Sequence, residues 1–109
     1  MDEYSIVVTP YAEAQLKEIV DYISVELLNP MAANAFVDRI QEKISKLKEF
    51  PEAYPLVGIT YWNERGIRKL IVKSFVVYFN VDKAKHNVNV LAVVYGKMDQ
   101  LKQLNKLDF

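Results

Sequence analysis

The chain has no cysteine, only three glycines and a single histidine among its 109 residues. Without cysteine it has no disulfide framework and no thiolate metal site, and one histidine is too few for the usual zinc sites. Gly58, Gly66 and Gly96 lie too far apart to form a glycine-rich phosphate loop. We therefore expect no cofactor and no metal. His86 itself is either a general base or a solvated turn residue, and we favour the turn residue.

Long apolar stretches are also missing. A membrane-spanning helix needs about 20 apolar residues, and every apolar run in this chain is much shorter. No basic start followed by an apolar run opens the sequence, so we expect no signal peptide and a cytoplasmic protein. Half of the chain, 51%, is nevertheless hydrophobic. That content excludes intrinsic disorder and predicts one globular domain over residues 1–109.

Neither sign of charge is in excess, because 14 Lys and Arg residues balance 14 Asp and Glu residues. The balance hides an asymmetry along the chain. Residues 1–64 hold five basic and eleven acidic residues, whereas residues 65–109 hold nine basic and three acidic ones. Such a division indicates a basic working face, two halves that attract each other, or simply two solvated surfaces.

Apolar spacing predicts two helices. Thr9-Pro10 and Asn29-Pro30 each combine an N-cap residue with a proline at the first helical position. Behind each cap, apolar residues recur at the spacing of a helix with one buried face. The stripes are Leu16, Ile19, Val20, Ile23 and Leu27 in a helix that should stop near Leu28, and Ala33, Phe36, Val37, Ile40, Ile44 and Leu47 in a helix that ends before Pro51. The tight turn between them predicts an antiparallel hairpin.

Short runs rich in β-branched and aromatic residues predict four strands. Their ranges are 4–9, 66–73, 75–81 and 88–95. The third is almost wholly apolar, so we expect a central strand buried on both faces. A partly ordered loop should cover residues 51–64, and a short final helix residues 98–107. The order βααβββ predicts an α+β two-layer sandwich, with a helical hairpin packed on one face of a largely antiparallel sheet.

Several short motifs, none specific alone, occur in a fixed order over almost the whole chain. They are Val8-Thr9-Pro10 with Ala12 and Ala14, Ile19-x-x-Tyr22-Ile23, Asn29-Pro30-x-Ala32-Ala33 with Phe36, then Leu47 and Pro51, Arg65-Gly66-Ile67-Arg68-Lys69-Leu70, Val77-Tyr78-Phe79-x-Val81, and Val94-Tyr95-Gly96-Lys97-x-Asp99. In this arrangement the chain resembles the RelE/ParE superfamily of toxins from type II toxin–antitoxin systems. The resemblance is closer to the ParE branch than to the RelE branch.

The resemblance implies the βααβββ fold and a cognate antitoxin whose C-terminal segment wraps the toxin. ParE-type members are described as inhibitors of DNA gyrase, and RelE-type members as ribosome-dependent endoribonucleases that cut messenger RNA. Our first hypothesis is a ParE-like toxin that binds gyrase or another replication protein, with Lys69, Lys73 and Lys97 as target-binding residues. A non-toxic binding module of the same fold is a further alternative. Whether the chain forms a homodimer through its helix groove stays open.

An RNase of the RelE type needs a group that activates the 2′-hydroxyl, cations for the phosphate and an acid for the leaving oxygen. Two basic positions of the RelE pattern fall here on Val76 and Met98, and Phe109 stands where another RNase subgroup ends in His-Tyr. We therefore assign no catalytic residues, although an enzymatic activity is not excluded. The RNase alternative, with ribosome and messenger RNA as partners, would use Lys69, Lys73, Tyr95 and Lys97.

The basic residues Arg65, Arg68, Lys69 and Lys73 form a cluster in the sequence, but they cannot all contribute to one site. Strand alternation places Arg68 on one face and Lys69 and Lys73 on the other, and either face could meet the helices. We favour Arg68 toward the helices, because otherwise two lysines would be buried. Arg68 is then structural and pairs with a backbone carbonyl or with a carboxylate such as Glu18 or Asp21. Lys69 and Lys73 are then exposed.

The aromatic residues near these cations each have two interpretations. Tyr61 and Trp62 could stack on bases or on a partner, or they could cover the end of the core. Tyr95 could be a catalytic phenol, or it could pack beside Tyr78 or Phe79. In each case we favour packing.

Overall fold

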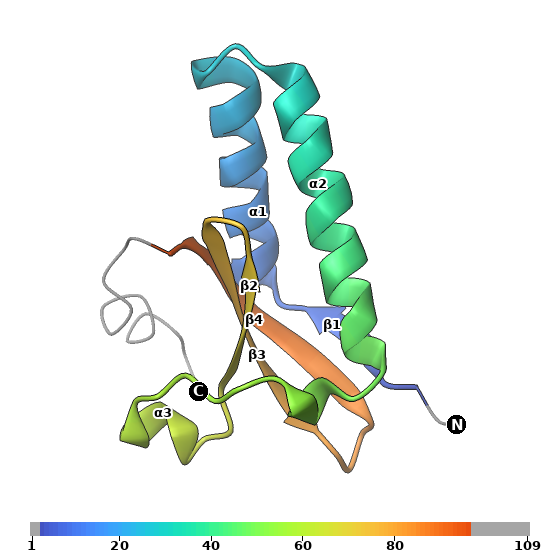
Figure 1. The fold of residues 1–109 in the computed structure, drawn as a ribbon. Coiled ribbons are helices and arrows are strands. Elements are labelled where there is room, and N and C mark those ends of the chain that lie inside the picture. The colour runs from blue at the N-terminus through green and yellow to red at the C-terminus, as the bar shows by residue number, and fades with distance from the viewer. Residues whose placement is uncertain (1–2, 97–109) are drawn as a thin grey trace.

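Two long helices lie side by side on one face of a four-stranded sheet (Figure 1). The computed structural model describes residues 3–96. The elements are β1 (Ser5–Val8), α1 (Pro10–Asp21), α2 (Pro30–Ser45), α3 (Thr60–Asn63), β2 (Arg68–Val72), β3 (Phe75–Asp82) and β4 (Asn87–Tyr95). The predicted α+β sandwich is confirmed, with one short helix, α3, inside the expected loop. The helix predicted over residues 98–107 lies outside the described residues.

Both long helices begin with the caps that the sequence indicates. The hydroxyl of Thr9 accepts a hydrogen bond from the N–H of Ala12 at 3.2 Å, and the side-chain oxygen of Asn29 accepts one from Ala32 at 3.1 Å. In each case a proline takes the first helical position, where a missing N–H costs nothing. The N-termini of both helices in the hairpin are therefore specified by local chemistry.

The first helix ends differently from the prediction. Its regular part stops at Asp21, and a π-helical turn, Tyr22–Glu26, completes it. The N–H of Leu27 donates to the carbonyl of Tyr22, five residues back, at 3.1 Å. Because this wider turn changes the helical register, Leu27 leaves the expected buried stripe and is 55% exposed. Leu28 follows in a left-handed conformation, with φ of 50°, at the reversal toward α2.

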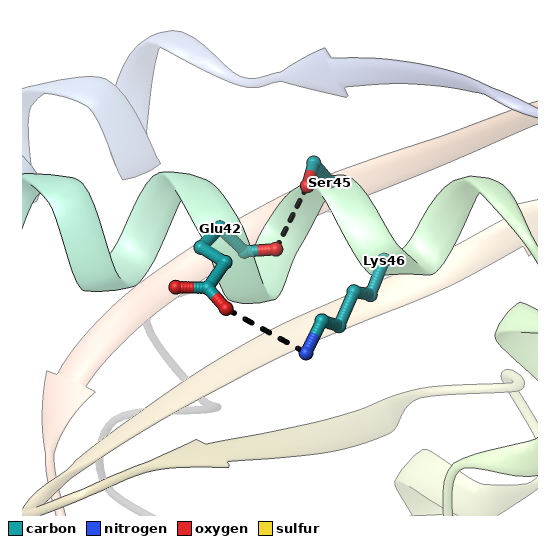
Figure 2. Close-up of polar contacts among 3 residues, drawn as sticks. All are labelled: Glu42, Ser45 and Lys46. Carbon is teal, nitrogen blue, oxygen red and sulfur yellow. Dashed lines mark hydrogen bonds and ion pairs between the residues drawn. The ribbon is translucent and has the colours of Figure 1, made fainter.

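The last turn of α2 is closed by local polar contacts, shown in Figure 2. The Ser45 hydroxyl donates to the carbonyl of Glu42 at 2.8 Å, and Lys46 Nζ lies 3.7 Å from Glu42 Oε1. This ion pair is more than half exposed and contributes little to stability. The described part of the chain has one other ion pair, Lys83–Glu52 at 3.1 Å, which joins the basic and acidic halves of the sequence. Among residues 3–96, this is the one ion pair that joins the acidic residues 1–64 to the basic residues that follow them.

The strands follow the order β1-β4-β3-β2, so β3 and β4 are central. β1 pairs with β4 in parallel, and the other pairs are antiparallel. The prediction for β3 is confirmed, because Val77, Tyr78 and Phe79 are all buried. The β3–β4 register shifts between Tyr78 and Phe79, which makes a bulge at Leu91. The bulge reverses the side-chain alternation along β4.

Each face of the sheet has its own apolar cluster. The inner core, between the sheet and the helices, contains Ala12, Ile40, Ile44, Leu47, Leu70, Val72, Val77, Phe79, Val88, Val90 and Val93. The outer cluster, on the opposite face, contains Val57, Trp62, Ile67, Tyr78, Ala92 and Val94. The segment around α3 therefore covers part of the outer face, the face on which the sequence analysis expects Lys69 to be exposed.

Candidate interaction groove

An open groove of about 650 Å³ lies between the end of the first helix and the end of the sheet that holds the β2–β3 turn and the last residue of β4. We call it the hairpin groove. It is lined by Glu18, Ile19, Tyr22, Ile23, Leu27, Ser74, Phe75 and Tyr95. The first five come from α1, its π-helical turn and Leu27 directly after that turn, and the last three from the β2–β3 turn, β3 and the end of β4. The groove therefore joins three segments that are distant in sequence.

Aromatic rings form a packed wall on the sheet side of the hairpin groove. The ring of Phe75 lies 5.7 Å from that of Tyr95 and 4.9 Å from that of Phe36. Both contacts have the tilted geometry that aromatic pairs prefer. Tyr95 therefore packs against Phe75 and not beside Tyr78 or Phe79, because its strand position is opposite Phe75.

The helix side of the groove leaves large apolar side chains exposed. Tyr22 is 56% exposed and Leu27 55% exposed. Outside the groove, Val25, Leu28 and Met31 are also large apolar residues and are even more exposed. Large apolar side chains left exposed at a groove are typical of a protein-interaction site.

Tyr95 of the groove lies on a stretch of β4 that β1 does not pair with. β1 pairs with β4 only as far as Val90. Beyond that point the side chain of Gln15 accepts a hydrogen bond from the N–H of Val93 at 2.8 Å, so this edge faces α1. Strand alternation directs the N–H of Tyr95 to the same edge. A bound peptide could thus meet both apolar side chains and backbone groups.

Arg68 takes the face predicted for it, and its partner is one of the two kinds that the sequence analysis left open. It alternates with Leu70 and Val72, which belong to the inner core. Its Nη1 donates to the carbonyl of Tyr54 at 2.7 Å, and the residue is half-buried. Of the two kinds of partner predicted for Arg68, the backbone carbonyl is confirmed, and no ion pair with Glu18 or Asp21 occurs among residues 3–96.

The predicted target-binding lysines do not share an exposed strand face. Lys69 is half-buried and pairs with Tyr78 across β2 and β3 on the face of the outer cluster. Lys73 is exposed, but it lies in the turn after β2 with φ of 53°. The expectation that Lys69 is exposed was wrong because the α3 segment covers part of this face. Lys97 lies outside the described residues.

The residues of the RNase alternative are only partly brought together. Lys73 and Tyr95 lie at the same end of the sheet, because the N–H of Gly96 donates to the carbonyl of Ser74 at 2.7 Å. Lys69 is four residues away from Lys73 along β2 and its turn. Burial raises the pKa of the Tyr78 phenol opposite Lys69, so this phenol is a poor proton donor near neutral pH.

His86 is not the solvated turn residue that the sequence predicted. Its ring stacks on that of Tyr4, with centroids 3.9 Å apart and planes within 11°. Its Nε2 is buried without a hydrogen-bond partner in the described part of the chain. His86 precedes β4, whereas Tyr95 of the hairpin groove ends that strand, so the imidazole is remote from the groove.

The two aromatic residues of α3 have different environments. Trp62 is 4% exposed and belongs to the outer cluster, which agrees with the packing interpretation. Tyr61 is exposed, and the guanidinium of Arg65 lies 3.5 Å from the centroid of its ring. Among residues 3–96 no group of three His, Cys, Asp or Glu side chains could hold a metal ion.

A second depression, of about 400 Å³, is lined by Glu3, Tyr4, Glu49, Phe50, Pro51, Glu52 and Ala53. Phe50 is exposed and left-handed, with φ of 50°. Neither this depression nor the contribution of Ser74 and Phe75 to the hairpin groove follows from the sequence. The clearest signal for the groove is the apolar stripe of the first helix, because Ile19, Ile23 and Leu27 of that stripe line it.

The geometry so far defines a small α+β protein with an apolar, open groove between its first helix and its sheet. A family model described as the ParE toxin of type II toxin–antitoxin systems matches residues 6–100. The chain therefore belongs to the ParE toxin family. No curated protein matches it in sequence.

Two solved structures share the fold. One is the chromosomal ParDE toxin–antitoxin system from P. aeruginosa, with 23% identity, a TM-score of 0.69, and coverage of 85% of this chain and 96% of that one. The other is a RelBE toxin–antitoxin complex from Mycobacterium tuberculosis, with 17% identity, a TM-score of 0.59, and coverage of 87% and 93%. In the described part of this chain no helix is long and apolar enough to cross a membrane.

Proposed function

We propose that this chain is a toxin that acts by binding a protein target, DNA gyrase or another replication protein, and that a cognate antitoxin neutralises it. The observation that carries the proposal is the hairpin groove, an apolar and aromatic surface left open on a ParE-family chain. Both solved relatives come from toxin–antitoxin systems, which supports an antitoxin as the occupant.

The antitoxin segment would bind in the hairpin groove in one of two ways. An amphipathic helix could place its apolar face against Tyr22, Leu27 and Phe75, or an extended segment could add to the β4 edge near Tyr95. Both modes use surfaces that are adjacent, so a single segment could combine them. Because the groove is open and lies beside a strand edge, we expect its occupant to be a peptide segment and not a small molecule.

Contacts with the toxic target would use other residues. Lys73 is exposed in the β2–β3 turn, Lys69 is half-buried within β2, and Lys97 follows the end of β4 in sequence. Such cations suit an acidic protein surface or a phosphate backbone. Because Lys73 directly precedes Ser74 of the groove, a bound antitoxin would hinder access of the target to it.

The RNase alternative has one observation in its favour, the shared position of Lys73 and Tyr95 at one end of the sheet. It lacks the cations that the RelE pattern carries at the positions of Val76 and Met98. A phosphate without those cations loses much of its transition-state stabilisation. Protein binding is therefore the better supported activity.

The test begins with co-expression of the chain and the product of the adjoining reading frame. A stable complex is expected, and no binding at micromolar concentration would refute the antitoxin. The free chain should then arrest growth and inhibit supercoiling by purified gyrase. Arrest with normal supercoiling would redirect the search to another replication protein if DNA synthesis stops first, and to the RNase alternative if translation stops first. Normal growth would indicate the non-toxic module.

A further inference from the structure

A single charged side chain lines the otherwise apolar hairpin groove. Of the eight lining residues, seven are apolar, aromatic or hydroxyl-bearing, and the eighth is Glu18. Glu18 is exposed and forms no ion pair among residues 3–96. Its carboxylate is therefore hydrated while the groove is empty.

The surrounding helix strengthens the negative charge. From Pro10 to Glu26 the chain carries the carboxylates Glu13, Glu18, Asp21 and Glu26 against one cation, Lys17. The helix side of the groove therefore carries an excess of acidic residues, which favours cationic segments over acidic ones.

An occupant that covers the groove changes the environment of Glu18. An apolar segment would remove water from the carboxylate without replacing its hydrogen bonds, which is costly. A lysine or arginine in the segment would restore a charged partner, and the pair would be stronger than in water because the surrounding surface is apolar. The groove therefore discriminates between occupants by charge as well as by shape.

We infer that Glu18 is a specificity-determining residue of the hairpin groove, and that the antitoxin segment bound there carries a lysine or arginine within or beside its apolar face. The inference rests on the proposed function, and it adds the chemical class of the segment. A second copy of this chain is a poorer occupant, because a two-fold pairing of groove on groove would bring two acidic walls together.

The experiment compares Glu18→Gln with Glu13→Gln in the full chain. Glu13 is an exposed carboxylate on the same helix that does not line the groove. Binding to the purified product of the adjoining reading frame is measured by titration calorimetry at low and high salt. We expect Glu18→Gln to weaken binding about tenfold and to reduce its salt dependence, and Glu13→Gln to change it by less than about twofold.

A reciprocal charge exchange makes the test specific. Glu18→Lys should weaken binding further, and changing the partnering lysine or arginine of the antitoxin to glutamate should restore it. Thermal melting of each variant checks that the fold is intact. Binding of Glu18→Gln as tight as that of the unchanged chain would overturn the inference and leave the proposed function standing.

Two other outcomes also contradict the inference that Glu18 determines the specificity of the hairpin groove. If the unchanged chain forms no complex at all, both the inference and the antitoxin proposal fail. If the chain alone sediments as a dimer that Leu27→Asn dissociates, a second copy occupies the groove instead.

Discussion

Replacing Arg68 with alanine should lower the stability of the folded chain, although Arg68 does not line the hairpin groove. Its guanidinium is half-buried and donates to the Tyr54 carbonyl at 2.7 Å. The ring of Tyr54 in turn meets that of Phe79 edge-on, with centroids 6.0 Å apart. Arg68 therefore holds the segment before α3 against the inner core.

The size of the effect follows from this geometry. Breaking a fully buried ion pair costs about 3–5 kcal/mol, but Arg68 is only half-buried and its partner is a carbonyl. A hydrogen bond that involves a charged group contributes about 1.5–3 kcal/mol. We expect Arg68→Ala to lower the free energy of unfolding by about 2 kcal/mol, which corresponds to a fall in Tm of roughly 10 °C for a domain of this size.

The assay is chemical and thermal unfolding followed by circular dichroism. Lys73→Ala is the matched control, since Lys73 is an exposed cation at the end of the same strand and should change stability by less than about 0.5 kcal/mol. Arg68→Lys should retain part of the stability because an ammonium can still donate. If Arg68→Ala and Lys73→Ala melt together, the structural role of Arg68 is refuted.

Two further predictions concern chemistry. Messenger RNA should remain uncut in a primer-extension assay with ribosomes, because the cations of the RelE pattern are missing at Val76 and Met98; cleavage that Lys69→Ala or Tyr95→Phe abolishes would establish the RNase alternative. Burial raises the pKa of Tyr78 above its ordinary value of 10.0, so the unfolded chain loses this proton first and stability should fall as pH rises above about 10. Tyr78→Phe should lessen that fall, and identical alkaline unfolding curves for the two proteins would show that Tyr78 does not cause it.

The elements that the sequence predicts well are those with local signals. Thr9-Pro10 and Asn29-Pro30 determine where two helices begin, because the capping oxygen and the proline are both within the first turn. The burial of β3 on both faces follows from the apolar run Phe75–Phe79 at its start. Alternation also placed Arg68 correctly on the helix side of β2.

The features that were missed depend on contacts between distant segments. The π-helical turn that exposes Leu27 has no local signature in the sequence. The partial burial of Lys69 depends on where the α3 segment folds back, and Trp62 gave only an ambiguous indication of it. His86 was expected in solvent because nothing local reveals its stacking on Tyr4, 82 residues earlier.

The hairpin groove could be predicted only in outline for the same reason. Its helix side follows from the apolar residues of α1, but its sheet side depends on the pairing that brings Phe75 opposite Tyr95. The bulge at Leu91 resets side-chain alternation along β4, so the face that Tyr95 presents could not be derived from a simple count of residues.

The most direct test of the binding groove is the affinity of the antitoxin for two variants of the π-helical segment. Leu27 lines the groove, whereas Val25 is comparably exposed two residues away and does not. Leu27→Asn removes apolar surface without a change of charge and should weaken binding between about tenfold and a hundredfold. Val25→Asn should leave the Kd within about threefold of that of the unchanged chain. Equal affinities for all three proteins would contradict the assignment of the hairpin groove as the antitoxin site.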